Sequence, residues 1–356
     1  MLGFEIRGKE DASLRYDVPK PEAIPGECLV KVKYTGICGS DMHMWRTGIQ
    51  LQTGGRKFIL GHEPVGVVEE INYDGELDYA VGDYVVGRPF YSCGRCRFCR
   101  EGHESLCDRF MMSLWREGGC GSYAEYTTLM AKSCYKLRSG VDLRIAALAE
   151  PMSVAVYDVR QSGVGPGDSV LISGGGTIGA LIGLMCQRKG ARVLFSEPVA
   201  SRRAFLAELG FDSIDPTEPE PACKARVKNE GQNFPFVFEV SGAQQSYNLC
   251  VELVEKAGTI MIVGVTQAPK EASFRTILVK QVILRGVNMY EDRDFYDAVK
   301  IINSGKLDKE LRCFVTDVFP LEQAFDAYMT AMDPSGEHVK VLIDCDVKGV
   351  IPEQAE

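Results

Sequence analysis

The chain lacks an excess of positive charge. Its 356 residues include 40 Lys and Arg against 49 Asp and Glu, which gives a formal net charge of −9. A field of this sign does not attract the phosphates of nucleic acids or the headgroups of anionic membranes. We therefore expect no nucleic acid and no membrane among the partners.

Long apolar segments are also missing. Residues 1–7 contain no apolar stretch of the kind that a secretory signal has. The longest run without a charged residue spans 169–187, and three consecutive glycines interrupt it. That interruption favours a buried strand-to-helix turn over a membrane-spanning helix. Thirteen cysteines without a secretory signal indicate a reducing compartment, so we predict a cytoplasmic location.

Four of the cysteines are concentrated in one short segment. They form a C-x2-C-x2-C-x7-C array, whose spacing suits a single tetrahedral Zn²⁺: Cys93, Cys96, Cys99 and Cys107. Disulfides are disfavoured because thiols so close in sequence pair only with strain. No proline follows Cys107, which argues against an iron–sulfur cluster. A closed site of four cysteines is structural, so the chemistry must lie elsewhere. Eight other cysteines are predicted to be small buried residues: Cys28, Cys120, Cys134, Cys186, Cys223, Cys250, Cys313 and Cys345.

The pattern of apolar residues changes near residue 155. Before it, short alternating segments such as 29–34 and 66–71 predict an antiparallel, β-rich domain. After it, continuous apolar strands alternate with helical segments, with strands at 169–172, 192–196, 236–240 and 259–264 and helices at 178–189, 201–209 and 244–256. This alternation is typical of a parallel sheet covered on both faces. Ser201 is a candidate N-cap of its helix.

A glycine-rich turn lies between the first of these strands and the first helix. Residues 174–179 match G-x-G-x-x-G, and the strand-turn-helix context gives the motif its mechanism. Gly174 allows the tight turn, Gly176 lets the backbone approach a pyrophosphate, and Gly179 lets the helix pack against the strand. The N-terminus of the helix then offers free N–H groups to phosphates.

Glu197 stands at the end of the next strand, where an acid decides which dinucleotide binds. A carboxylate there accepts hydrogen bonds from the ribose of NAD and repels a 2′-phosphate. Arg202 and Arg203 lie nearby and would favour NADP, but with Glu197 in place we expect NAD. The predicted cofactor site also contains Thr177, Ile178, Arg202, Val263 and Val265.

Histidine is scarce, with four in the chain, and two of the four stand in glycine-flanked motifs. Cys38 and His43 lie in the segment 36–43, and His62 and Glu63 directly follow a glycine. Cys38, His62 and a carboxylate from Glu63 or Glu150 supply a thiolate, an imidazole and a carboxylate, a mixed set that leaves one tetrahedral position open. Such a set is typical of a catalytic zinc, which lowers the pKa of a hydroxyl bound at the open position.

These motifs, in this order, make the chain resemble the zinc-dependent medium-chain dehydrogenases over essentially its whole length. The resemblance rests on segments 36–43, 61–63, 93–107 and 174–179. Within the family it is closest to the polyol branch of sorbitol, butanediol and threonine dehydrogenases, on segments 38–43, 150–154 and 159–164.

The family's fold implies an α/β protein of two domains. A doubly wound Rossmann domain with a parallel sheet would bind NAD and span residues 154–296. A β-rich, GroES-like catalytic domain would comprise residues 1–153 and 297–356.

The resemblance also implies two zinc ions per chain. Cys38, His62 and Glu63 would hold the catalytic zinc, with a water or substrate oxygen as the fourth ligand. Glu150 would bind that water or exchange with it, and whether Glu63 or Glu150 is the resting ligand stays open. The cysteine array would hold the structural zinc.

Three further residues would support the chemistry. Ser40 and His43 would pass the proton of the substrate hydroxyl toward the cofactor ribose and solvent. Asp41 would orient His62. The implied reaction is hydride transfer between NAD and the secondary alcohol of a polyol, sugar alcohol or cyclitol, or the corresponding ketone.

One departure from the pattern concerns the substrate. Sorbitol dehydrogenases tend to carry Arg-Tyr where this chain has Met289 and Tyr290, so the polar anchor for sorbitol is missing. Segments 45–56 and 110–119, with Trp45, Arg46, Trp115 and Arg116, either line the substrate cleft or are surface and interface residues.

Two alternatives to a polyol dehydrogenase remain at this point. One is oxidation of an amino alcohol, as in threonine dehydrogenases, although no carboxylate anchor is evident. The other is a non-catalytic protein that binds NAD or zinc. The family forms dimers and tetramers, and we expect a homo-oligomer assembled near residues 282–288.

Overall fold

The structure is a computed structural model that describes residues 1–48, 58–113, 116–266 and 269–346, and it divides into two compact units. Unit 1 comprises Met1–Glu150, Glu291–Pro334 and Lys340–Glu356, whereas unit 2 comprises Pro151–Tyr290 and Ser335–Val339. The chain therefore passes into unit 2 twice, the second time for only five residues.

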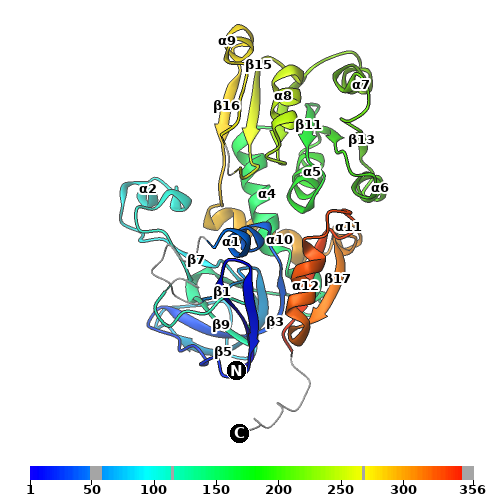
Figure 1. Ribbon diagram of the computed structural model, residues 1–356. Helices are drawn as coiled ribbons and strands as arrows, with labels where there is room; N and C mark the ends of the chain where they lie inside the picture. The colour runs from blue at the N-terminus through cyan, green and yellow to red at the C-terminus, as the bar shows by residue number, and fades with distance from the viewer. Residues whose placement is uncertain (49–57, 114–115, 267–268, 347–356) are drawn as a thin grey trace. The chain divides into compact units, whose positions relative to one another are not determined.

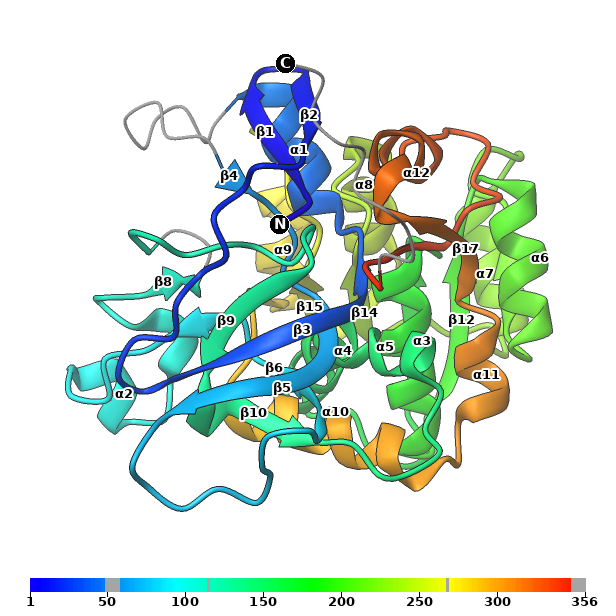
Figure 2. The ribbon, with the colours of Figure 1, turned by 90° about the horizontal axis from the view of Figure 1, so that it is seen from below.

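Unit 1 is built on a seven-stranded sheet (Figure 2). Its strands follow the order β10-β6-β5-β3-β18-β17, and β9 also pairs with β3. The bounds are β3 Glu27–Gly36, β5 Pro64–Asn72, β6 Tyr84–Gly87, β9 Tyr126–Met130, β10 Cys134–Lys136, β17 Val315–Pro320 and β18 Lys340–Asp344. All of these pairings are antiparallel except that of β17 with β18, so the predicted antiparallel, β-rich architecture is confirmed.

Smaller elements complete unit 1. A three-stranded sheet contains β1 Gly3–Gly8, β2 Asp11–Arg15 and β4 Phe58–Ile59, and a two-stranded one contains β7 Phe90–Tyr91 and β8 Met111–Met112. The α-helices are α1 Gly39–Thr47, α2 Arg97–Arg100, α3 Leu143–Ala146, α10 Asp292–Ser304, α11 Asp308–Arg312 and α12 Ala324–Ala331, and the 3-10 helices include η2 Glu104–Leu106, η4 Ala131–Ser133 and η5 Leu321–Gln323. Cys28, Val30 and Val85 belong to a buried apolar cluster of this unit.

Unit 2 contains a six-stranded parallel sheet (Figure 1). The order is β13-β12-β11-β14-β15-β16, with β11 Ser169–Ser173, β12 Arg192–Ser196, β13 Asp212–Ile214, β14 Phe234–Glu239, β15 Val254–Ile262 and β16 Ile283–Gly286. The helices are α4 Ala149–Ser162, which begins two residues before the unit, α5 Thr177–Arg188, α6 Ala200–Glu208, α7 Pro221–Lys228, α8 Gln244–Leu253 and α9 Phe274–Lys280. The order turns back at β11, which lies between β12 and β14, as in a doubly wound fold, and this confirms the predicted Rossmann architecture.

The uncharged run at 169–187 forms β11, the glycine turn and most of α5. Within the residues that the structure describes, no helix has both the length and the apolar character needed to cross a membrane.

Two local predictions were wrong. Helix α6 has Val199 rather than Ser201 at its N-cap, because the Ser201 hydroxyl donates to the carbonyl oxygen of Ser335, 134 residues away. Cys223 is exposed and Cys313 is half-buried, whereas the other six of the eight cysteines predicted to be buried are buried. Cys223 lies on α7 and Cys313 is the C-cap residue of α11, and both helices are short and bury only one or two of their residues.

Candidate active site

Three predicted zinc ligands come together in unit 1. Cys38 is the N-cap residue of α1, two residues after the end of β3, and His62 and Glu63 lie between β4 and β5. One ligand atom from each residue lies within 4.8 Å of the others, and His62 and Glu63 are buried. Ligands about 2.0–2.3 Å from a tetrahedral zinc are separated by about 3.5 Å, so small side-chain movements would close the set around a metal.

A buried hydrogen-bond chain lies behind His62. The His62 Nδ1 is 3.2 Å from Asp41 Oδ1, and the Tyr123 hydroxyl donates to Asp41 Oδ2 at 2.6 Å. Burial acts to raise the pKa of Asp41, but the charge and hydrogen bonds of His62 and then of Tyr123 outweigh it, so that the pKa lies below its ordinary value. Burial acts to lower the pKa of His62, but the charges of Asp41 and Cys38 outweigh it and raise the pKa, so the metal-free ring is an imidazolium and a metal would have to displace the Nε2 proton. An ionised Asp41 would then accept from Nδ1–H and hold the ring with Nε2 toward the metal.

The other three predicted catalytic residues are not part of this group of ligands. Ser40 lies in the first turn of α1, and its hydroxyl donates to Cys38 Sγ at 3.3 Å. His43 lies three residues later on the same helix and is half-buried. Glu150 is buried, but its carboxylate is not one of the three clustered ligand groups.

Lys340, the first residue of β18, was not among the predicted site residues. Its ammonium group forms an ion pair with Glu63 and donates to the carbonyl oxygen of Ile37 at 3.0 Å, and the residue is only 4% exposed. Burial acts to lower the pKa of Lys340, but the negative charges of Glu63, Cys38 and Glu150 outweigh it and raise the pKa. A lone lysine at the start of the apolar segment 339–343 was the available signal.

Unit 2 contains a cavity of about 680 Å³ at the glycine turn. Seven of the predicted cofactor residues line it: Gly174, Gly176, Thr177, Ile178, Gly179, Glu197 and Arg202. Val263 and Val265 are not among its lining residues. A methyl group on Gly179 would lie 2.0 Å from the carbonyl oxygen of Gly174, whereas one on Gly176 would meet no protein atom within 4 Å. The turn therefore leaves open space where a pyrophosphate is expected to approach.

Glu197 is buried at the edge of this cavity and braces the turn. Its Oε2 accepts from the Gly175 N–H at 2.6 Å, and its Oε1 accepts from the Val199 N–H at 2.9 Å. A carboxylate has about four lone-pair positions, so acceptor capacity remains for a ribose. Arg203 is engaged with Asp215 at 3.0 Å and with backbone carbonyls, and Arg202 faces the cavity.

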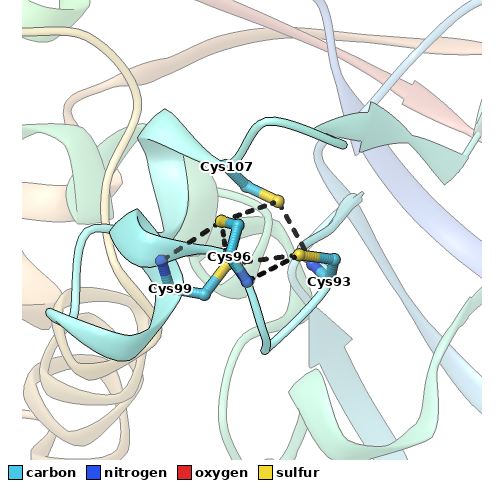
Figure 3. Close-up of side chains that lie close together, drawn as sticks. All are labelled: Cys93, Cys96, Cys99 and Cys107. Atoms are coloured by element: carbon cyan, nitrogen blue, oxygen red, sulfur yellow. Dashed lines mark hydrogen bonds between the residues drawn. The ribbon is translucent and has the colours of Figure 1, made fainter.

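The four cysteines of the array gather their sulfur atoms in one place (Figure 3). The Sγ of Cys96 lies 3.4 Å from that of Cys99 and 4.0 Å from that of Cys107. Backbone N–H groups point at the sulfurs, as in the hydrogen bond from the Cys96 N–H to Cys93 Sγ at 3.3 Å. The N–H groups of Arg95 and Cys96 lower the pKa of the Cys93 thiol to about 6, which favours the thiolate that a metal needs.

The cysteine lobe, residues 93–107, is fastened to the start of α10. The Glu291 carboxylate accepts from the Ser105 N–H at 3.2 Å and from the Ser105 hydroxyl at 2.9 Å. Arg88 is buried and forms an ion pair with Glu104. Glu291 is the first residue of unit 1 after the chain returns from unit 2, so the lobe holds that return point.

The proposed cleft residues have other partners where they are described. Trp45 is buried, and its ring packs edge-on against those of Phe325 and Tyr328. The Arg116 guanidinium lies 2.9 Å from Glu27 and also donates to the hydroxyl of Thr128. These contacts favour a structural role for both residues. Residues 49–56 and Trp115 lie outside the described residues.

Comparison with known proteins places these features in a family. Residues 24–139 match the family model for the alcohol dehydrogenase GroES-like domain, and residues 177–304 match that for zinc-binding dehydrogenases. The chain is 34% identical, over 91% of its length and 93% of the relative's, to the 2-dehydro-3-deoxy-L-galactonate 5-dehydrogenase of Pseudoalteromonas atlantica. It is 31% identical to the D-xylulose reductase A of Aspergillus oryzae, over 96% of each chain.

A solved structure agrees with this placement. The L-idonate 5-dehydrogenase of Escherichia coli superposes with a TM-score of 0.82 at 25% sequence identity, covering 96% of this chain and 97% of that one. The family predicted from the motifs is confirmed, and so is the enzymatic class. The chain belongs to the zinc-dependent medium-chain alcohol dehydrogenases, in their polyol branch, and is a nicotinamide-dependent oxidoreductase that acts on alcohols.

Proposed function

We propose that unit 1 carries the catalytic zinc site and unit 2 the NAD site of a dehydrogenase for secondary alcohols of sugar acids and polyols. The observation that carries this proposal is the convergence of Cys38, His62 and Glu63 within 4.8 Å, with an ionised Asp41 behind the imidazole. These donors fit Zn²⁺, which at an open site supplies Lewis-acid polarisation of a substrate hydroxyl.

The protein side chains have distinct tasks in this proposal. Asp41 and Tyr123 fix the orientation and tautomer of His62. Ser40, which already donates to Cys38, is placed to exchange a proton with the substrate hydroxyl, and His43 carries that proton onward. Glu150, buried in the same unit, supplies a second carboxylate that binds or replaces the fourth ligand.

The substrate class is supported by the names of relatives. Two of them are 5-dehydrogenases of sugar acids and one is a ketose reductase. The experiment is an NADH absorbance assay on the zinc-loaded chain with L-idonate, 2-dehydro-3-deoxy-L-galactonate, D-xylulose, simple polyols and L-threonine. Turnover with a member of the first four groups and its loss in Cys38→Ser support the proposal. Turnover with threonine alone would assign the amino-alcohol chemistry instead, and full turnover in metal-free protein would overturn the mechanism.

We propose NAD as the cofactor in preference to NADP. The support is the Glu197 carboxylate at the edge of the unit 2 cavity, while Arg203 is held by Asp215. Initial rates with NAD⁺ and NADP⁺ test this directly. In Glu197→Ser the preference should move toward NADP⁺, because the repulsion of a 2′-phosphate is lost while Arg202 remains in place.

We also propose two zinc ions per chain and a cytoplasmic location. The support for the second zinc is the convergence of the four sulfur atoms of the cysteine lobe, and the support for the location is that the structure leaves all thirteen cysteines as thiols.

The proposed partner of the chain is a second copy. Strand β16 is an edge of the parallel sheet, and large apolar side chains are exposed there and on the preceding helix α9, including Phe274 at 74% and Leu278 at 77%. An unpaired edge beside an apolar patch favours association through that edge. Light scattering should give a dimer or a tetramer, and Leu278→Glu with Ile283→Lys should give a smaller species. A wild-type monomer would refute this assembly.

A further inference from the structure

Lys340 is a buried cation in direct contact with one of the three proposed zinc ligands. Its ammonium group is ion-paired with Glu63 and donates to the Ile37 carbonyl, and no more than 4% of the residue is exposed. A buried charge is unfavourable unless it is paired, so the position of Lys340 depends on Glu63. The Glu63 carboxylate is therefore both the partner of the Lys340 ammonium group and a proposed ligand of the zinc.

The pair is packed tightly enough to restrain Glu63. A methyl group built on Gly36 would lie 1.8 Å from Glu63 Oε2 and 2.6 Å from Lys340 Cε, so the two side chains pack directly on a backbone without a Cβ. The Glu63 carboxylate consequently has little freedom to turn. An ammonium group on one oxygen draws the carboxylate away from a second cation, since both compete for the same negative charge.

The five residues that precede Lys340 belong to unit 2, the unit with the cofactor cavity. These residues are Ser335–Val339, and the carbonyl oxygen of Val339 accepts from the Thr177 hydroxyl at 2.6 Å. Thr177 is the first residue of α5 and lines the cofactor cavity. A single peptide bond thus separates a carbonyl that is held by the wall of the cofactor cavity from the residue that is paired with Glu63.

We propose that Lys340 is a positioning residue that controls how strongly Glu63 binds the zinc. In this proposal the Thr177–Val339 hydrogen bond transmits cofactor binding to Lys340, so that the bond between Glu63 and the metal changes when the cofactor binds. The inference rests on the proposed function of the Cys38, His62 and Glu63 group. With Lys340 in place, Glu63 is shared between the two cations. Without it, Glu63 is free to approach the metal fully.

The test replaces zinc with Co²⁺ and compares the visible spectrum and the rate of cobalt loss to a chelator in the wild type, Lys340→Met, Lys340→Arg and Lys33→Met. Lys33 is the matched control, because it lies on β3 of the same sheet and is paired with Asp346 at 2.7 Å instead of with a residue of the metal group. The cysteine lobe contributes equally to all four spectra, so the difference spectra report the three-ligand site.

We expect Lys340→Met to shift the cobalt spectrum and to slow cobalt loss about tenfold, the scale on which neighbours of a metal ligand act. Lys340→Arg and Lys33→Met should match the wild type. If the wild type binds two cobalt ions and Lys340→Met leaves spectrum and retention unchanged, the role of Lys340 is refuted while the proposed function stands. If the wild type binds cobalt only in the lobe, both fail.

A second variant tests the coupling and does not depend on the folding of Lys340→Met. Thr177→Val removes the hydrogen bond to Val339 and leaves Lys340 and the metal ligands in place. Saturating NAD⁺ should shift the cobalt spectrum of the wild type, and this shift should be smaller in Thr177→Val. An equal shift in both proteins, or none in the wild type, would overturn the coupling.

Discussion

Alanine substitutions at two glycines of the unit 2 turn should have different effects. One should lower both stability and cofactor affinity, and the other should lower cofactor affinity alone. In Gly179→Ala the new methyl group would lie 2.0 Å from the carbonyl oxygen of Gly174, a backbone atom that cannot turn aside. The start of α5 must move about 1.4 Å to restore an ordinary contact, and overpacking of this kind costs about 1–3 kcal/mol. Both the free energy of unfolding and the affinity for cofactor should fall.

Gly176→Ala should separate these two effects. Its methyl group meets no protein atom within 4 Å, and the φ angle of −73° suits any residue. The free energy of unfolding should fall by less than about 1 kcal/mol, since alanine is only a poorer N-cap for α5. The methyl group nevertheless occupies the space where the pyrophosphate approaches, so the Kd for NADH should rise at least about tenfold, or 1.4 kcal/mol.

The assays are urea unfolding and titration of NADH fluorescence on the same preparations. We expect Gly179→Ala to be impaired in both and Gly176→Ala only in the titration. A folded Gly176→Ala protein with the wild-type Kd would show that the turn does not approach the cofactor. If Gly179→Ala had the same free energy of unfolding as the wild type, the close packing of α5 against Gly174 would be contradicted.

Three further predictions follow. Asp41→Asn should weaken metal binding at the three-ligand site about 10- to 100-fold in a chelator competition, because the acceptor of His62 loses its negative charge and an amide cannot serve both His62 and Tyr123 as two carboxylate oxygens do. Unchanged affinity would contradict the role of Asp41. Cys96→Ser should lower the melting temperature, while the protein that remains folded keeps its catalytic activity. Cys38→Ser should abolish turnover without changing the melting temperature. Loss of activity in both variants with unchanged melting would refute the assignment of a structural and a catalytic zinc. The hydrogen bonds from Arg144 hold the pKa of Asp142 below its ordinary 3.8, so this carboxylate stabilises the fold above about pH 4 and the contribution is lost as the pH falls through the lowered pKa. Asp142→Asn should therefore lose less stability than the wild type in acid, with a difference at neutral pH of less than about 1 kcal/mol, and identical acid unfolding curves would be inconsistent with the shift.

Local sequence patterns were sufficient for most of the fold. The strand predicted at 192–196 coincides with β12, and the helix predicted at 178–189 is displaced by one residue from α5. Continuous apolar strands and glycine turns are set by neighbours in sequence, which explains their reliability. The cysteine array and the His62-Glu63 pair could also be predicted from the sequence, because metal ligands need particular residue types at close spacing.

The residues that sequence reasoning missed depend on contacts between distant segments. Lys340 is paired with Glu63, 277 positions earlier in the chain. A lone lysine within an apolar segment signals a buried cation but does not identify its partner. Ser201 resembled an N-cap but bonds to Ser335. Arg116 lies in a segment that was a candidate either for the substrate cleft or for the surface, and its guanidinium is paired with Glu27 of β3. Local patterns report which residue types are present, and the tertiary fold decides which of them remain available for function.

The central claim is that a second zinc, held by Cys38, His62 and Glu63, is separate from the zinc of the cysteine lobe. Anomalous diffraction at the zinc absorption edge, from crystals of the zinc-loaded chain, tests it most directly. We predict two peaks per chain, one among the four sulfurs of the lobe and one bounded by Cys38, His62 and Glu63. A single peak in the lobe, from crystals of protein that is active in solution, would contradict the account.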